Sequence, residues 1–171
     1  GGAQLRRRLG GSRIEELMDL SSFLSQGAVR VMAGSASKKR LFQDLGDIAQ
    51  AIYGLNSATT VDALQERETL GPTGVGHGVA LPHARLHGLN RMAGVFIRLE
   101  RPLDFDSVDR VPVDLIFALF APKDSGVEHL KALAAVSRTM RDEATRAKLR
   151  KNSDPAALHA VLTSSRSTQA A

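Results

Sequence analysis

The sequence Val113-Asp114-Leu115-Ile116-Phe117-Ala118-Leu119-Phe120 is almost continuously apolar, and Pro122 follows two residues later. A strand with one face in water alternates polar and apolar side chains, whereas a strand covered on both faces is apolar throughout. Because only Asp114 interrupts this run, residues 113–120 predict a strand that is buried on both faces.

The segments around this run alternate between strand-like and helix-like patterns. Residues 27–32 and 92–99 are expected to be strands, because they carry the β-branched or aromatic side chains typical of them. Five helices are predicted, the longer ones from capping residues or from apolar residues at helical spacing and the last one with Pro155 in its first turn. They run from a cap at Ser35 or Ser37 through Tyr53, over 61–70 behind a cap at Thr60, and over 125–141, 143–151 and 155–162. In helix 125–141 we expect these side chains to face inward: Leu130, Leu133, Ala134 and Met140. Strands that alternate with helices indicate a single α/β domain, with a mixed β-sheet flanked by helices on both faces.

Length and composition fit an ordinary globular domain. A chain of 171 residues can bury roughly 70% of its unfolded surface around one core. The sequence has no cysteine, which excludes disulfides, thiolate catalysis and cysteine-ligated metal sites and agrees with a cytoplasmic location. No stretch approaches the roughly 18 apolar residues that cross a bilayer, so we expect no stable membrane insertion.

The net charge of +5 comes mainly from one end of the sequence. Four of the 23 basic side chains precede Glu15, the first acidic residue, so the rest of the chain carries 19 basic and 18 acidic groups. Nucleic acid is not an expected partner, because the aromatic side chains that would stack bases are not interleaved with the basic ones. We expect residues 1–13 to be a disordered basic segment, residues 14–162 to be the working domain and residues 163–171 to be a frayed tail.

Three of the five histidines, His77, His83 and His87, are close together in the sequence. His83 follows the apolar residues 79–81 and Pro82, whose ring fixes its own backbone and favours an extended conformation before it. Functional side chains often lie at such strand ends in open α/β sheets. A largely unprotonated imidazole is also a competent nucleophile near neutral pH. His83 is therefore the candidate reactive group.

Two other interpretations of these histidines stay open. His83 can be a side chain packed at the margin of the sheet, with both ring nitrogens hydrogen-bonded. Alternatively, His77, His83 and His87 can be ligands of a zinc ion. His83 and His87 share a face only on a helix, however, and Pro82 and Gly88 disfavour a helix there.

Three further features are ambiguous by themselves. The glycines at 71, 74, 76 and 78 match neither a P-loop nor a dinucleotide fingerprint, and they suit either an anion-binding backbone or a tight turn. Arg67 precedes them on a predicted helix, where it can reach toward His83 or stay in solvent. His129 lies about one turn inside helix 125–141, and a surface or half-buried structural histidine is its simplest interpretation. His159 is expected to be structural.

Taken together, these residues resemble a known family. The run from Arg67 to His83, RETLGPTGVGHGVALPH, resembles the active-site segment of IIA domains of the phosphoenolpyruvate-dependent phosphotransferase system. The matching branch is the mannitol/fructose type, which includes the nitrogen-regulatory IIA proteins. Further similarity lies in residues 94–96, 102–106, 112–119 and 128–133, and the resemblance extends over roughly residues 20–162.

The resemblance implies roles for three residues. It implies that His83 accepts a phosphoryl group, that His129 assists without being phosphorylated, and that Arg67 stabilises the phosphoryl charge. The implied donor is a histidine phosphocarrier protein, HPr or a similar protein, which enzyme I charges from phosphoenolpyruvate. Such transfer depends on positioning and charge stabilisation, so neither a cofactor nor a metal ion is expected. The apolar residues next to His83 in the sequence are candidate contacts for the carrier: Leu81, Leu86 and Leu89.

The use of the phosphoryl group is open to more than one interpretation. A cytoplasmic regulator that relays it to an unknown downstream target protein is favoured, because the sequence has no IIB-type cysteine and no fused carrier or membrane domain. The alternatives are the IIA component of a fructose- or mannitol-type sugar uptake system, and a binding module of the same fold without phosphorylation. In the first two cases the protein is a phosphotransferase component with a phosphohistidine intermediate, rather than a free-standing catalyst.

Overall fold

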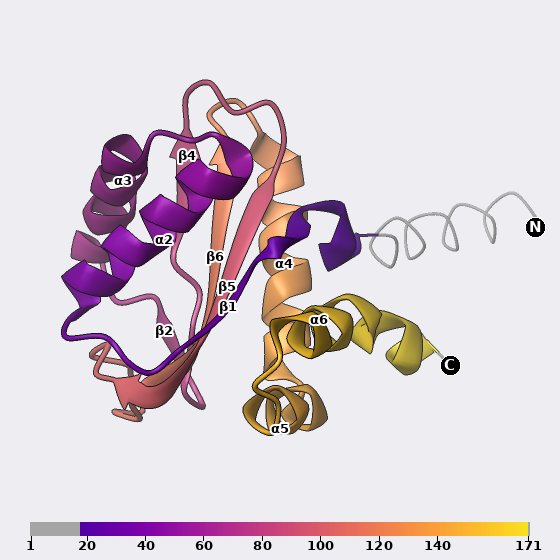
Figure 1. Ribbon diagram of the computed structural model, residues 1–171. Coiled ribbons are helices and arrows are strands. Elements are labelled where there is room, and N and C mark those ends of the chain that lie inside the picture. Colours follow the sequence, from indigo (N-terminus) through magenta and orange to yellow (C-terminus); the bar gives the residue numbers. More distant parts are fainter. Residues whose placement is uncertain (1–17, 171) are drawn as a thin grey trace, which may run out of the picture.

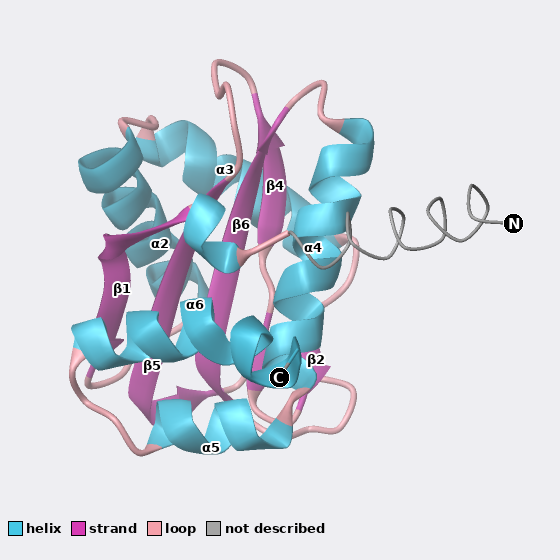
Figure 2. Ribbon diagram, turned by 90° about the vertical axis from the view of Figure 1, so that its right-hand side faces the viewer, coloured by secondary structure: helices cyan, strands magenta, loops and turns pink. Residues whose placement is uncertain are grey.

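The structure, a computed structural model, describes residues 18–170, with side chains up to residue 164. The expected basic segment, residues 1–13, lies outside the described residues. Within the described part, six strands form one mixed sheet and helices cover both of its faces (Figures 1 and 2). This architecture confirms the predicted α/β fold.

The strand that the sequence analysis started from is central to the sheet. The strands are β1 (Leu24–Met32), β2 (Gly74–Gly76), β3 (Val79–Ala80), β4 (His83–Leu86), β5 (Ala93–Leu103) and β6 (Val113–Pro122). Their order is β1-β5-β6-β3-β2, and β4 also pairs with β6. β5 and β6 are antiparallel, whereas β1 is parallel to β5, and β3 and β4 are parallel to β6. All of residues 115–120 in β6 are buried, as a strand covered on both faces requires.

β3 and β4 follow one another along the same edge of β6. β3 lies opposite Leu115 and Ile116, and His83, the first residue of β4, lies opposite Leu119. Pro82 separates the two short strands because it has no N–H to donate to the ladder. Its carbonyl still accepts the N–H of Leu119 at 2.9 Å. The sheet therefore fixes the backbone of His83 beside the buried central strand.

One 3-10 helix and five α-helices complete the described part. They are η1 (Leu20–Ser22), α2 (Lys38–Tyr53), α3 (Ser57–Thr69), α4 (Gly126–Arg141), α5 (Glu143–Arg150) and α6 (Pro155–Ala170). Figures 1 and 2 show α2 and α3 on one face of the sheet, and α4, α5 and α6 on the other. Among the described residues, no helix is both long and apolar enough to cross a bilayer.

Two helix boundaries differ from the predicted ones. α2 is capped by Ser37, one of the two predicted caps. α3 begins earlier than predicted, because the Asn56 side chain accepts a backbone N–H of the first turn at 2.9 Å. Thr60 is not the cap: it lies inside α3 and donates its hydroxyl to the Asn56 carbonyl. α6 continues to Ala170, beyond the predicted end at residue 162.

The inward face of α4 also differs from the predicted one. Met140 is buried and Leu133 is partly buried, but Ala134 is exposed and Leu130 is 64% exposed. The buried residues of the helix are His129, Ala132, Ala135, Val136, Thr139 and Met140. Apolar side chains occur on both sides of this helix, so the spacing alone allows two inward faces. Packing against β6, η1 and α6 selects the face that buries His129.

Candidate active site

A hydrogen bond fixes the ring of His83 at the start of β4. Its Nδ1 lies 2.9 Å from the carbonyl oxygen of Leu81. A carbonyl oxygen can only accept, so Nδ1 carries the proton and donates it. In the neutral ring the other nitrogen, Nε2, then keeps an unprotonated lone pair. The half-buried His83 therefore presents Nε2 as its nucleophilic atom.

The start of α4 brings His129 to His83. The centroids of the two rings are 5.8 Å apart and the ring planes form an angle of 65°. Only 7% of His129 is exposed. Burial is the main cause that lowers the pKa of His129 below its ordinary 6.5, and the nearby His83 and Arg85 lower it further. His129 is therefore neutral near pH 7 and carries one ring proton.

Arg85 determines which nitrogen of His129 carries that proton. The Nε of Arg85 donates to Nδ1 of His129 at 3.1 Å. A guanidinium has no acceptor, so Nδ1 must be unprotonated and the proton must lie on Nε2. This Nε2 is buried and has no hydrogen-bond partner in the described part of the chain. The site thus holds an N–H donor without an acceptor beside the ring of His83.

Sequence analysis missed Arg85, although a signal for it exists. Residues two apart in a strand lie on the same face, and Arg85 follows His83 by two residues in β4. That spacing is informative only once residues 83–86 are known to be a strand. The short segment between Pro82 and Gly88 shows no pattern that predicts one.

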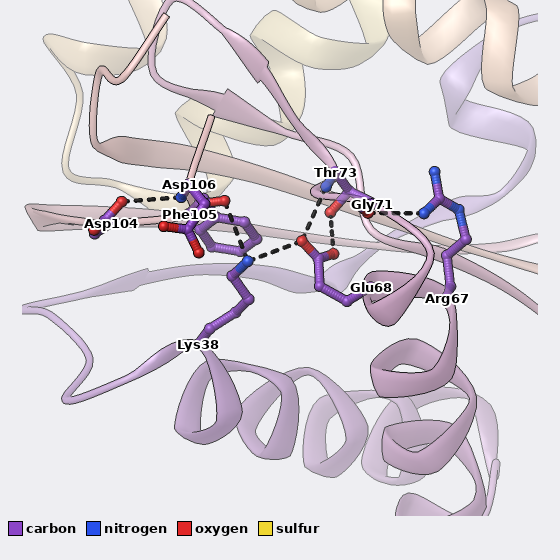
Figure 3. Close-up of polar contacts among 8 residues, drawn as sticks. All are labelled: Lys38, Arg67, Glu68, Gly71, Thr73, Asp104, Phe105 and Asp106. Carbon is purple, nitrogen blue, oxygen red and sulfur yellow. Dashed lines mark hydrogen bonds and ion pairs between the residues drawn. The ribbon is translucent and has the colours of Figure 1, made fainter. Parts of the chain in front are cut away.

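Arg67 lies in the last turn of α3 and is directed toward the loop that follows (Figure 3). Its Nη1 donates to the carbonyl of Gly71 at 2.9 Å. At the end of this loop, the Thr73 carbonyl accepts the N–H of Leu81 at 2.9 Å, which ties the loop to the chain just before His83. Within the described residues, Arg67 makes no hydrogen bond to either histidine of the pair. The structure therefore places Arg67 at the end of α3, bonded to the loop that leads toward His83.

Glu68 fixes the same loop through a partly buried network (Figure 3). Its carboxylate accepts the backbone N–H of Thr73 at 2.9 Å and the hydroxyl of Thr73 at 2.6 Å. Lys38 Nζ pairs with Glu68 at 3.0 Å, donates to the Phe105 carbonyl at 3.2 Å and lies 4.8 Å from the centroid of the Phe105 ring. The Glu68 side chain is only 9% exposed. Because each of its polar atoms is satisfied, the network supports the loop that Arg67 contacts.

The turn at residues 76–78 lies away from His83. Its three residues have φ angles of 100°, 59° and 77°, which glycine adopts freely. His77, the middle residue, is held in this conformation by its backbone: Asp109 accepts its N–H at 2.9 Å, and Arg150 donates to its carbonyl at 2.6 Å. From this turn to His83 the extended chain covers about 16 Å. The glycines at 76 and 78 therefore form a tight turn at the far end of β3.

The other histidines have separate environments. His87 is exposed in the turn after β4. The Nε2 of His159 lies 2.8 Å from the carbonyl of Leu24 and links α6 to β1, which gives it a structural role. Among the described residues, no group of three or more histidine, cysteine or acidic side chains is placed to hold a metal ion.

Exposed apolar side chains lie next to the site residues in α3 and α4. Leu81 and Leu86, predicted as carrier contacts, belong to the core instead, since they are only 6% and 5% exposed. Leu70 follows the last turn of α3 and is 81% exposed, and Val127 and Leu130 on either side of His129 are exposed as well. These three side chains are therefore exposed apolar groups near the site that a docking protein could contact.

Comparison with known proteins agrees with this geometry. Residues 22–165 match the family described as phosphoenolpyruvate-dependent sugar phosphotransferase system, EIIA 2. The chain belongs to this family. This EIIA domain is 41% identical over 145 residues to a nitrogen regulatory protein of Bradyrhizobium diazoefficiens, which covers 85% of this chain and 95% of that protein. It is 31% identical over 135 residues to a fructose-specific EIIA component of Haloferax volcanii, which covers 78% of this chain and 88% of that protein.

A solved structure shows the same fold. The crystal structure of the nitrogen regulatory protein IIA-Ntr from Neisseria meningitidis matches this EIIA domain with a TM-score of 0.79 at 35% identity. The match covers 84% of this chain and 99% of that chain. The predicted family resemblance is confirmed, and the homologues include nitrogen regulatory proteins. The roles of His83, His129 and Arg67 stay predictions.

Proposed function

We propose that this EIIA domain relays a phosphoryl group, which His83 accepts from an HPr-like phosphocarrier protein and which acts chiefly as a regulatory signal to a downstream protein. The observation that carries the proposal is the arrangement of two imidazoles. His83 offers an unprotonated Nε2 because its Nδ1 is bonded to the Leu81 carbonyl. Beside it, His129 holds a buried Nε2–H without a partner in the described part. A nucleophile and a donor for a phosphoryl oxygen are the parts that such transfer needs.

The proposed step exchanges one phosphorus–nitrogen bond for another. The lone pair of His83 Nε2 attacks phosphorus, and the bond between phosphorus and the carrier's histidine breaks. The carrier's imidazole leaves with the electron pair of that bond. The His83 ring becomes cationic because Nδ1 keeps its proton, and the Leu81 carbonyl, 2.9 Å away, stabilises this charge.

His129 and Arg67 are proposed to stabilise the charge on the transferring group. A phosphoryl oxygen would satisfy the unpaired Nε2–H of His129. Arg67 uses Nη1 for the Gly71 carbonyl, and its other N–H groups can donate to the phosphoryl group. Because Arg67 makes no hydrogen bond to either histidine in this structure, we expect its side chain to rotate when the carrier docks or when His83 is phosphorylated.

A regulatory use of the phosphoryl group is favoured over sugar uptake. The relative with a nitrogen regulatory name is 41% identical, whereas the relative named as a fructose-specific EIIA component is 31% identical. The second candidate, a IIA component of a fructose- or mannitol-type uptake system, rests on the latter relative. A binding module without phosphorylation is disfavoured because His83, His129 and Arg67 are all present. The proposal includes a cytoplasmic place of action, with which the absence of cysteine agrees.

Incubation with phosphoenolpyruvate, enzyme I and an HPr-like carrier tests the proposal. Intact-mass measurement should show one added phosphoryl group, which is labile in acid and stable in base as a phosphoramidate is. His83→Ala should abolish the addition, and the control His87→Ala, a change at an exposed histidine four residues away, should keep it. Stoichiometric labelling of His83→Ala would refute the proposal.

Onward transfer separates the two uses of the phosphoryl group. The phosphorylated protein is mixed with a fructose-type IIB domain, whose acceptor is a cysteine. Loss of the phosphoryl group to that domain at the rate of an uptake component would favour sugar transport. Retention of the group would favour the regulatory function.

A further inference from the structure

The hydrogen bond between Arg85 and His129 joins a strand to a helix at the site. Arg85 lies two residues after His83 on β4, so both side chains leave the same face of the strand. Its Nε donates to Nδ1 of His129 at 3.1 Å, and the ring of His129 lies edge-on to the ring of His83. An otherwise exposed arginine thus contacts the residue that the proposed function uses as a hydrogen-bond donor.

A single protonation state of His129 is compatible with this bond. Every nitrogen of a guanidinium is a donor, and the group does not lose its charge in proteins. A proton on Nδ1, in the other neutral tautomer or in the imidazolium, would place one N–H against another at 3.1 Å. The contact therefore requires that Nδ1 of His129 is unprotonated and that Nε2 carries the proton.

The proton on Nε2 has no acceptor within the described residues. The atom is buried, and a buried donor that remains unpaired costs free energy, so such atoms are rare in folded proteins. A rotation of the ring would break the bond to Arg85. The bond therefore holds the ring in one orientation, in which this N–H stays unpaired next to the ring of His83.

We propose that Arg85 is a positioning residue for phosphoryl transfer: it holds His129 in the Nε2–H tautomer and directs that N–H to the phosphoryl group on His83. The identity of this group rests on the proposed function, whereas the tautomer and the orientation rest on the contact between Arg85 and His129. Arg85 acts through His129, so its effect on transfer should disappear when His129 is absent.

The tautomer can be measured without any phosphoryl donor. In protein labelled with ¹⁵N-histidine, NMR correlation of the ring nitrogens should show His129 with a proton on Nε2 and none on Nδ1 near neutral pH. In Arg85→Met, which removes the donor at an exposed position, the ¹⁵N shift of Nδ1 should move toward its protonated value. The matched control Arg138→Met, at an exposed position of α4, should leave the His129 shifts unchanged. Unchanged shifts in Arg85→Met would overturn the proposal even if the protein is never phosphorylated.

Transfer rates then test whether Arg85 acts through His129. Loss of a residue that orients a reacting group typically costs about 10- to 100-fold, so Arg85→Met should slow phosphorylation by the carrier to that extent. The double variant Arg85→Met, His129→Ala should be no slower than His129→Ala alone. If the two effects multiply instead, Arg85 contacts the phosphoryl group itself and the positioning role is wrong. If wild-type protein accepts no phosphoryl group, the proposed function fails, and the tautomer measurement alone decides the role of Arg85.

Discussion

Two histidines that lie edge to face in this protein carry their protons on different nitrogens. His83 has its proton on Nδ1 because the neighbouring group is a carbonyl oxygen, and His129 has its proton on Nε2 because the neighbouring group is an arginine. The difference follows from the hydrogen-bonding chemistry of Leu81 and Arg85 and not from the imidazoles themselves. In the proposed function, this difference makes one ring the nucleophile and the other the hydrogen-bond donor.

We predict that His129→Ala slows phosphorylation without changing which residue is phosphorylated. A donor that stabilises the transferring group typically contributes about 10²- to 10⁴-fold, so the rate of transfer from the carrier should fall within that range. Single-turnover kinetics measure the rate, and mass spectrometry of peptides should still find the label on His83. A rate within twofold of wild type would show that His129 is structural.

Two elements, the loop after α3 and the helix α4, bring the other side chains to β4. In the loop, the Thr73 carbonyl accepts the N–H of Leu81 and the Thr73 hydroxyl donates to Glu68. Glu68 in turn forms an ion pair with Lys38 (Figure 3). α4 turns one face to the sheet and leaves Leu130 in solvent next to the buried His129. The contribution of each element to the stability of the domain can be tested separately from phosphoryl transfer.

For α4 we predict that Met140→Ala and Leu130→Ala have unequal effects on the free energy of unfolding. Met140 is 2% exposed, and truncation of such a side chain should cost about 2–5 kcal/mol. Leu130 is 64% exposed, so its truncation should change stability by less than about 0.5 kcal/mol. Urea denaturation of both variants measures the difference. A larger loss from Leu130→Ala would mean that the inward face of α4 is the one that the sequence predicted.

For the loop we predict that Glu68→Gln destabilises the domain. An amide offers one acceptor oxygen where the carboxylate accepts two bonds from Thr73, and it leaves Lys38 without its ion pair. The loss should be about 1–3 kcal/mol because the groups left unpaired are largely buried. Urea denaturation is again the measurement, and Glu66→Gln, at an exposed position of the same helix, is the control. Equal stabilities of the two variants would contradict the network's supporting role.

The sequence predicts the long elements better than the short ones. β6 could be predicted because a run of eight residues with only one polar side chain indicates a strand buried on both faces. The longer helices could be predicted from the spacing of their apolar residues. β2, β3 and β4 are two to four residues long, and their existence depends on pairing with β6 or with each other. Arg85 is informative only once β4 is known, so its contact with His129 could not be predicted.

The whole domain assembles its site from segments that are distant in the sequence. His83 belongs to β4, which pairs with β6, His129 belongs to a helix on one face of the sheet, and Arg67 belongs to a helix on the other face (Figures 1 and 2). Folding therefore creates the buried environment of His129, which the unfolded chain lacks. A consequence is that the stability of the domain depends on the protonation of this residue.

We predict that the domain loses stability as the solution becomes mildly acidic, and that His129 causes part of the loss. Burial, with His83 and Arg85 nearby, lowers the pKa of His129 below 6.5 in the folded state. The unfolded chain therefore binds a proton at a higher pH, so the free energy of unfolding decreases as the pH falls below about 6.5, until folded His129 is protonated as well. Urea denaturation near pH 7.5 and near pH 5.5 measures the change. His129→Gln should show a smaller change than wild type, and an equal change would contradict the assignment.

The most direct test of the relay mechanism is to identify the nitrogen that carries the phosphoryl group. Protein labelled with ¹⁵N-histidine is phosphorylated by phosphoenolpyruvate, enzyme I and the carrier, and NMR then detects the one-bond coupling between ³¹P and ¹⁵N. Because Nδ1 of His83 donates to the Leu81 carbonyl at 2.9 Å, we expect phosphorus on Nε2 of His83, with Nδ1 still protonated. Phosphorus on Nδ1 of His83, or on any other residue, would contradict the mechanism.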